Sequence, residues 1–455
     1  MVRSVMFFSA MCLMMSEILI AQPAQQAVIP DTPVGKLARS YLVAFNSGAE
    51  SNLRAFFLDH ASPASFDQNP VAQRVRRSLQ MRSEIGEITV RRLIGSSDFQ
   101  LSILVQTRRG DWLTFEFRCD SQPPHYLAGI GIDQSSPELA DQVRAANIDE
   151  LIRRVKSHID TLARNDQFSG VVLIAQNGKP LLLKACGYAD RKKRIPNATD
   201  TKFNIGSINK TFTKLAILRL ASEGKLSLSD TLKKFLPDYP NKDAANKVTV
   251  QHLLDMTSEI GDFFGERYRN TPKERIRTIS DYLPLFADLP LQFEPGTSRR
   301  YSNGGYIVLG AIIEKVTRRD YYDRIRETIF KPAGMMDTDW FDKDARVNNL
   351  ALGYTRQRGE EWVQNYETLP GRGSSAGGGY STATDLLKYT IALSEGKFNV
   401  PGYEGVRGLG VAGGAPGLNA ALEWDPRSGS AIVVMSNFDP PSAERVARTI
   451  RAWVP

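Results

Sequence analysis

The stretch FNIGSINKTFTKLAILRL, Phe203–Leu220, decides how the fold of this chain is understood. It places Ser207 and Lys210 three residues apart, a spacing that puts both side chains on one face of a helix. Apolar residues continue at helical spacing beyond the lysine. We therefore predict an amphipathic helix that begins near the serine and carries the lysine in its first turn.

A serine and a lysine in this arrangement can perform nucleophilic chemistry. A serine hydroxyl is a weak nucleophile unless a base lies within hydrogen-bond reach. Lys210 can be that base if apolar surroundings lower its pKa from the ordinary value of about 10.4. Backbone N–H groups at the start of the helix would help to bind a developing oxyanion. The alternative is an ordinary helix from which Lys210 extends its charged end to solvent.

The motif gains weight from its context, because Ser-x-x-Lys occurs at three places in this chain. At Ser222 and Ser394 a glycine precedes the lysine, which is typical of the end of a helix. Only at Ser207 does the helical pattern continue past the lysine. This copy is therefore the candidate for chemistry.

A second motif, Tyr-x-Asn, also occurs three times, at Tyr239, Tyr268 and Tyr301. Only the third follows a Pro-Gly turn and leads directly into an apolar helix. A phenol beside a cationic lysine can have a lowered pKa and pass a proton to a leaving group. The amide of Asn303 can hold a substrate carbonyl or fix the lysine.

These motifs, followed in order by a glycine-rich strand, resemble those of the serine β-lactamases and penicillin-binding proteins, particularly the class C branch and related hydrolases. The resemblance covers residues 148–455 and includes VTVQHLLDMTS, FEPGT, IFKPAGMMDT and GGGYSTATDLLKY. It implies a β-lactamase/transpeptidase-like domain, with an antiparallel sheet flanked by helices and a helical subdomain. It also implies acylation of Ser207, proton transfer by Lys210 and Tyr301, and hydrolysis of the acyl-enzyme by water, without a metal or an organic cofactor.

The glycine-rich stretch GVAGGAPGLNA departs from the pattern of that family. The family has Lys or His and then Thr-Gly, whereas this chain has Val411 and Ala412 before Gly413. By the same alignment, the N–H of Gly414 would join that of Ser207 in an oxyanion hole. The departure leaves two hypotheses open. One is an esterase, amidase or D-amino-acid peptidase, and the other is a catalytically silent sensor or binding protein.

Two arginines bear on this departure, and Glu259 is a separate, smaller departure from the family pattern. Arg372 and Arg407 lie in glycine-rich stretches, so either could supply the missing cation. Glu259 follows Thr257-Ser258, where such sequences commonly have glycine. A Gly-x-Ser-x-Gly stretch at 373–377 follows a loop, and no histidine comes after His252 to complete a triad, so we expect no chemistry there. The spacing of the four histidines predicts no metal site.

The length of 455 residues predicts two or three domains. Residues 34–133 start with helical patterns and continue as a hairpin around an Arg-Gly-Asp turn, which predicts an α+β accessory domain similar to nuclear transport factor 2 domains. Residues 148–455 would form the catalytic domain. Its hairpins, at Asn177-Gly178 and at 425–429, bracket a helical middle, which predicts one sheet assembled from distant parts of the chain.

Residues 1–21 have the pattern of a secretory signal, so we expect a periplasmic or secreted protein without a stable membrane anchor. The net charge of +8 comes from scattered basic residues and not from one block, which does not favour a nucleic-acid partner. The expected partner is a small ester, amide or peptide substrate.

Overall fold

The computed structural model divides into two compact units, Met1–Asp141 and Gln142–Pro455. It describes residues 28–63, 70–108, 110–120, 122–135, 144–357, 361–398, 400–401 and 403–455. The predicted secretory segment, residues 1–21, lies outside the described residues, as does part of the polar stretch between the predicted domains. In the part of the chain that is described, every helix is too short or too polar to span a bilayer.

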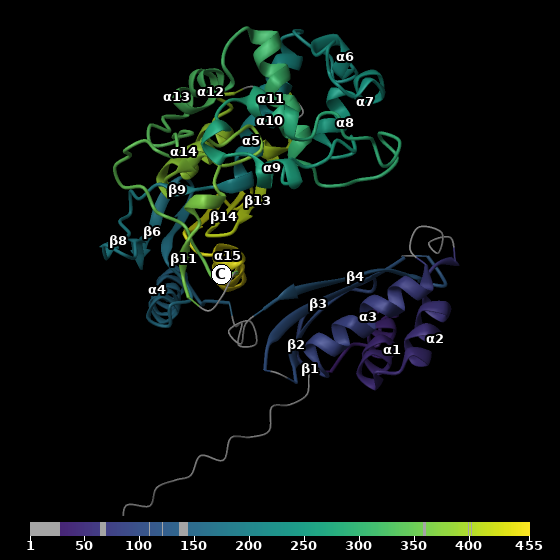
Figure 1. The fold of residues 1–455 in the computed structure, drawn as a ribbon. Coiled ribbons are helices and arrows are strands. Elements are labelled where there is room, and N and C mark those ends of the chain that lie inside the picture. The colour runs from purple at the N-terminus through teal and green to yellow at the C-terminus, as the bar shows by residue number, and fades with distance from the viewer. Residues whose placement is uncertain are drawn as a thin grey trace, which may run out of the picture. The chain divides into compact units, whose positions relative to one another are not determined.

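The first unit combines helices with an antiparallel sheet, as the sequence predicts (Figure 1). Its strands follow the order β1-β2-β3-β4. The helices and strands share one core, in which Tyr41, Phe45 and Phe117 are buried. The likeness to nuclear transport factor 2 stays a prediction. The elements are α1 (Pro33–Ser47), α2 (Glu50–His60), α3 (Val71–Ile85), β1 (Ile88–Ser96), β2 (Gln100–Thr107), β3 (Trp112–Cys119) and β4 (Leu127–Gln134).

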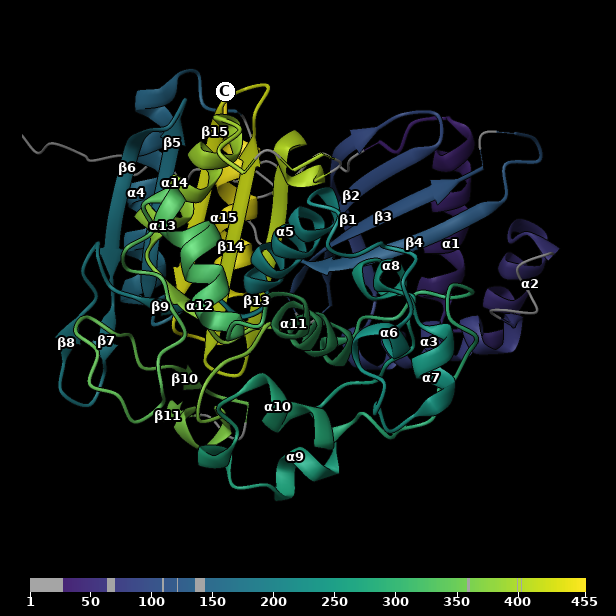
Figure 2. The ribbon, with the colours of Figure 1, turned by 90° about the horizontal axis from the view of Figure 1, so that it is seen from above.

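The second unit is built on an antiparallel sheet whose strands follow the order β13-β14-β15-β5-β6 (Figure 2). The register pairs Val433 with Leu173, so strands from the two ends of this unit lie side by side. This confirms the prediction of one sheet assembled from distant segments. The strands are β5 (Gly170–Gln176), β6 (Lys179–Cys186), β13 (Leu409–Ala415), β14 (Leu418–Asp425) and β15 (Ser430–Ser436).

Helices cover both faces of this sheet. Side chains alternate between the two faces of each strand, so neighbouring residues pack against different helices. On one face Val172 and Ile432 pack with apolar residues of α4 (Ile148–Arg164) and α15 (Ser442–Trp453). On the other, Leu173 and Val433 join the larger core, which includes residues of α5 (Asn209–Ser222) and α14 (Ala383–Ser394). The predicted sheet flanked by helices is confirmed.

Between β6 and β13 the chain forms mostly helices and long loops, as predicted. One of them, α11 (Asn303–Thr317), is a largely buried and mainly apolar helix that begins within the Tyr301 motif. The helices not yet given bounds in the second unit are α6 (Leu232–Phe235), α7 (Lys242–Lys247), α8 (Val250–Leu254), α9 (Glu266–Asn270), α10 (Ile279–Tyr282), α12 (Tyr321–Ile325) and α13 (Lys331–Ala333). Short strands are β7 (Tyr188–Asp190), β8 (Ile195–Pro196), β9 (Phe203–Asn204), β10 (Tyr354–Thr355), β11 (Val363–Gln364) and β12 (Tyr380–Ser381).

Candidate active site

Ser207 lies in a short 3-10 turn, η3 (Gly206–Ile208), directly before α5. Gly206 has a φ of 48°, in the left-handed region that glycine adopts without strain. A Cβ atom at this position would also lie only 3.0 Å from the backbone nitrogen of Gly414. Glycine at 206 therefore lets the chain turn sharply into the helix and bring Ser207 against strand β13.

Lys210 extends its side chain inward, so the alternative of a solvent-exposed lysine is wrong. The residue is 6% exposed. Its Nζ donates to Ser207 Oγ at 3.0 Å, to Asn303 Oδ1 at 2.7 Å and to the Ala376 carbonyl at 2.5 Å. Burial lowers the pKa of Lys210 to about 7, although the charge of Asp262 acts in the opposite direction. At neutral pH the amine is thus partly uncharged and able to accept the serine proton.

Tyr301 is the second group on the nucleophile, and its hydroxyl donates to Ser207 Oγ at 2.7 Å. The expectation of a lowered tyrosine pKa is wrong. Desolvation raises the pKa of the Tyr301 phenol, the hydrogen bond between Tyr301 and Ser207 lowers it, and the charge of Asp262 raises it further. The Lys210 amine instead lies over the phenol ring, 4.9 Å from its centroid. Tyr301 therefore stays protonated at neutral pH and serves as a proton donor.

Asn303 and Asp262 hold the lysine in place. Asn303 begins α11, and while its Oδ1 accepts from Lys210, its Nδ2 donates to Asp262 Oδ2 at 2.6 Å. Of the two roles expected for Asn303, the structure favours fixing the lysine. Asp262 could not be predicted from the sequence, because a single carboxylate in the loop GDFFG carries no signal that it lies near Lys210.

The opposite wall is the end of strand β13. Residues that flank a two-residue hairpin turn form a hydrogen-bonded pair, and such pairs alternate along an antiparallel ladder. Ala415 and Leu418 flank the turn here, so the N–H of Gly414 points away from β14. A Cβ at Gly413 would lie 2.6 Å from the Ser207 nitrogen. The N–H groups of Gly414 and Ser207 thus lie close together, as an oxyanion hole requires.

Asn419 holds this wall in position, and the motifs in the sequence did not reveal it. Its side chain is fully buried, and its Nδ2 donates to the Gly413 carbonyl at 3.0 Å and to Glu444 Oε2 at 2.9 Å. Its Oδ1 accepts from the backbone N–H groups of Ala443, at 2.6 Å, and of Glu444, at 3.2 Å. The only signal in the sequence is a polar residue within the apolar strand LNAALEW.

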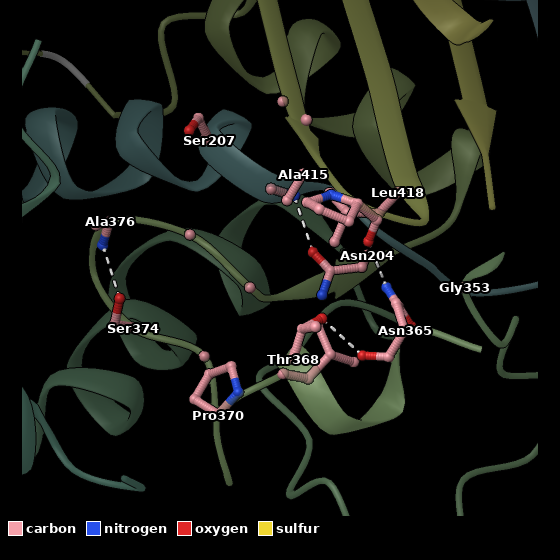
Figure 3. Close-up of a pocket in the computed structure, with 18 of the residues that line it drawn as sticks. Asn204, Ser207, Gly353, Asn365, Thr368, Pro370, Ser374, Ala376, Ala415 and Leu418 are labelled. Atoms are coloured by element: carbon pink, nitrogen blue, oxygen red, sulfur yellow. Dashed lines mark hydrogen bonds between the residues drawn. The ribbon is translucent and has the colours of Figure 1, made fainter. Parts of the chain in front are cut away.

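A cavity of about 920 Å³ opens in front of Ser207, lined from both the helical region and the sheet (Figure 3). It is mainly apolar, and its aromatic residues are Phe263, Phe264, Tyr268, Tyr282, Tyr301, Phe341, Tyr366 and Tyr380. Ala412, Gly413 and Gly414 line it along β13, whereas Val411 packs against the core. The strand therefore presents a small uncharged surface to the cavity.

Neither arginine considered for the missing cation lines this cavity. The guanidinium of Arg372 stacks 4.5 Å from the Tyr322 ring centroid, and its Nε donates to the Trp340 carbonyl at 3.1 Å. Arg407 is exposed at the end of η8 (Glu404–Arg407). Lys343 does line the cavity, but its Nζ lies 3.1 Å from Glu274 Oε1.

The remaining unusual residues have structural explanations. Glu259 has a φ of 55°, which explains why glycine suits this position, and its carboxylate lies 3.0 Å from Arg300 Nη1. Ser375, the centre of the Gly-x-Ser-x-Gly stretch, is fully buried and cannot meet a substrate. His252 forms a capping box with Thr249 in α8. Across the described ranges, no group of three His, Cys, Asp or Glu residues lies together as metal ligands would.

Comparison with known proteins finds relatives over most of the second unit. Residues 155–454 match the family model described as Beta-lactamase. The chain is 31% identical over 259 residues to Penicillin-binding protein 4* of Bacillus subtilis, covering 54% of this chain and 56% of that protein. It is 30% identical over 339 residues to PbpX of Bacillus subtilis, covering 70% of this chain and 83% of PbpX. The chain thus spans about half the length of the first of these relatives.

Solved structures show the same fold. A penicillin binding protein from Bacillus halodurans superposes with a TM-score of 0.60 at 31% identity, covering 65% of this chain and 98% of that one. The D-amino acid amidase from Ochrobactrum anthropi SV3 gives a TM-score of 0.57 at 23% identity, covering 67% and 98%. EstCE1, a hydrolase with promiscuous acyltransferase activity, gives a TM-score of 0.56 at 22% identity. That match covers 68% of this chain and 99% of EstCE1.

The close approach of β13 to η3 makes Gly413 sensitive to substitution. In Gly413→Ala the new Cβ would lie 2.1 Å from the Ile205 carbonyl oxygen, so β13 must move away from Ser207. We expect the labelling rate of Ser207 by a fluorophosphonate to fall by about 100-fold or more, as when one oxyanion donor is lost. Gly410→Ala, on the same strand with no atom within 4 Å of its new Cβ, is the control. Equal labelling rates in both variants would contradict this account of β13.

Asp262 should set the pH at which Lys210 becomes a base. Its negative charge raises the pKa of Lys210, so Asp262→Asn should lower that pKa below about 7 while keeping an acceptor for Asn303. The acid limb of the pH profile for Ser207 labelling should then move to lower pH, by roughly half a unit to one unit. Asp255→Asn, an exposed carboxylate bonded to Gln251, is the control. An unmoved limb, or a move to higher pH, would contradict the assignment.

Proposed function

Because the chain belongs to the Beta-lactamase family of serine hydrolases, we propose that it hydrolyses small esters or amides through an acyl-enzyme on Ser207. The observation that carries the proposal is the pair of hydrogen bonds on Ser207 Oγ, from Lys210 Nζ at 3.0 Å and from the Tyr301 hydroxyl at 2.7 Å. A base with a pKa near neutrality and a protonated phenol supply both proton transfers that acyl transfer needs.

Acylation begins with neutral Lys210. Its lone pair accepts the hydroxyl proton as Ser207 Oγ attacks the substrate carbonyl carbon. The negative charge that develops on the carbonyl oxygen faces the N–H groups of Ser207 and Gly414. When the tetrahedral intermediate collapses, the bond to the leaving group breaks, and the proton passes from Lys210 through the Tyr301 hydroxyl to the departing oxygen or nitrogen. Lys210 is then neutral again.

Deacylation repeats these steps with water. A water molecule attacks the acyl carbonyl carbon and gives its proton to neutral Lys210, directly or through Tyr301. The same two N–H groups face the oxyanion. As the intermediate collapses, the bond to Ser207 Oγ breaks, the acid product leaves, and the proton returns from Lys210 to the serine. The cycle requires only these side chains and water.

The cavity disfavours substrates that carry a carboxylate. Beside the two oxyanion donors, β13 presents Ala412, which offers neither a charge nor a hydroxyl to a substrate carboxylate. A hydrogen bond to a charged group contributes about 1.5 to 3 kcal/mol, so carboxylate-bearing substrates lose about one to two orders of magnitude in capture. The aromatic lining suits an apolar acyl group. We therefore propose an esterase, amidase or D-amino-acid peptidase activity that hydrolyses penicillins poorly.

A catalytically silent sensor is the second candidate, favoured by the loss of the charge and hydroxyl at Val411 and Ala412. Such a protein would bind peptidoglycan fragments or acyl ligands without turnover. The hydrogen bonds around Ser207 argue for the enzyme, because a binding protein has no use for a lysine with a pKa of about 7. On the strength of residues 1–21, we also propose that the protein acts in the periplasm or outside the cell.

Replacing the nucleophile tests the activity itself. Ser207→Ala and Lys210→Ala should each lower kcat/KM on 4-nitrophenyl butyrate by at least about 1,000-fold, because acylation needs both the nucleophile and its base. Ser222→Ala is the matched control, since Ser222 belongs to another Ser-x-x-Lys sequence and is exposed at the end of α5. If either active-site variant kept activity within tenfold of the natural protein, the acyl-serine mechanism would be wrong. Labelling without turnover in the natural protein would favour the silent sensor.

A matched pair of esters tests the neutral preference. The two esters share one alcohol and one acyl chain length, and one acyl chain ends in a methyl group while the other ends in a carboxylate. We expect kcat/KM to be about 10 to 100 times higher for the neutral ester, because β13 offers the carboxylate no cation. Equal values, or a preference for the carboxylate, would overturn this part of the proposal.

A further inference from the structure

Of the charged residues that line the cavity, Glu444 is the one for which the described part of the chain provides no ion pair. The charged residues that line the cavity are Asp342, Lys343 and Glu444. Asp342 lies 3.3 Å from Arg277, and Lys343 lies 3.1 Å from Glu274. Within the described ranges, no lysine, arginine or histidine lies within 4 Å of the Glu444 carboxylate.

The position of Glu444 is fixed relative to the end of β13 that contributes to the oxyanion hole. Its Oε2 accepts from Asn419 Nδ2 at 2.9 Å, and the same nitrogen donates to the Gly413 carbonyl at 3.0 Å. A Cβ at Gly414 would lie 3.3 Å from that nitrogen, so Asn419 joins the carboxylate directly to the two glycines. The carboxylate is therefore tied to the end of β13 that carries Gly413 and Gly414, and it lines the same cavity as Ser207.

The carboxylate is also held in a fixed position by its surroundings. Glu444 is in the first turn of α15, where the helix dipole favours a negative charge. It accepts a hydrogen bond from an amide that is itself fully buried and fully engaged. An ion pair with a substrate would therefore not require Glu444 to be reorganised. The aromatic lining of the cavity tolerates a cation too, since the faces of aromatic rings attract positive charge.

We propose that the preferred substrates carry a protonated amine, and that Glu444 binds this amine in the cavity that Ser207 also lines. Such substrates are amino esters, amino amides and short peptides with a free amino group. This inference rests on the proposed hydrolase function, and it goes further by naming the charge that the site selects. The uncharged surface of Ala412 removes an attraction for carboxylates, and Glu444 adds an attraction for ammonium groups.

The test measures kcat/KM on esters that differ only in one terminal group, which is methyl, carboxylate or ammonium. One series varies the acyl chain and the other varies the alcohol. We expect the ammonium ester to exceed the methyl ester by about tenfold in at least one series, as a hydrogen-bonded ion pair in a partly buried site provides. Higher salt should reduce the difference.

Substitution of Glu444 identifies the origin of this preference. In Glu444→Gln the side chain can still accept from Asn419, but it has lost its charge, so the ammonium-to-methyl ratio should fall to within about twofold of one. The ratio is the informative readout, because damage to β13 would lower turnover of all the esters alike. Glu423→Gln is the matched control, since Glu423 lies on β14 next to Arg451 and does not line the cavity. It should leave the ratio unchanged.

Binding to the Ser207→Ala variant separates this inference from the proposed function. Calorimetry with the three amides that match the esters requires no turnover. If no ester were hydrolysed, but the ammonium amide bound best and lost that advantage on Glu444→Gln, the hydrolase function would fall and the amine site would stand. If esters were hydrolysed without an ammonium preference in either series, or with a preference that survives Glu444→Gln, the inference would be overturned.

Discussion

The buried amino group of Lys210 is the constraint on which the rest of this site depends. An ammonium group in apolar surroundings is costly unless hydrogen bonds replace its hydration. Its three acceptors come from the turn before α5, from the first residue of α11 and from the loop before β12, at Ser207, Asn303 and Ala376. The lysine is therefore accommodated only when three distant segments have assembled. The same desolvation gives the amine a pKa of about 7. The burial of Lys210 therefore both requires the distant segments to assemble and makes the amine a base at neutral pH.

The second constraint is steric, because an oxyanion hole needs two backbone N–H groups from separate segments. One belongs to η3 and the other to β13, a strand at the edge of its sheet, whose outward N–H groups have no neighbouring strand. Gly206 and Gly413 lie at the contact between the segments, and a Cβ on either would meet the backbone of the other within 3.0 Å. Glycine at these positions therefore turns an exposed strand edge into a binding surface for negative charge.

Local patterns in the sequence predicted much of this arrangement. The hairpins, α5, the helical middle and the pairing of distant strands followed from spacing and turn residues, because those signals act over a few residues. Asp262, Asn419 and Glu444 could not be found in this way, since each acts through contacts with residues far away in sequence. The pKa direction of Tyr301 was wrong for the same reason, because it depends on burial and on Asp262, neither of which the motif reveals.

The lack of a cation at Val411 and Ala412 on β13 and the carboxylate of Glu444 on α15 both affect the charge of the cavity. The resemblance to class C enzymes implies a cation on β13, at the position of Val411. Val411 and Ala412 provide no such cation, and Asn419 ties Glu444 to the same strand. A negative charge at Glu444 would repel the substrate carboxylate that the missing cation no longer attracts. Under the amine-site proposal, both differences act in one direction and favour cationic over anionic substrates, without any change in Ser207, Lys210 or Tyr301.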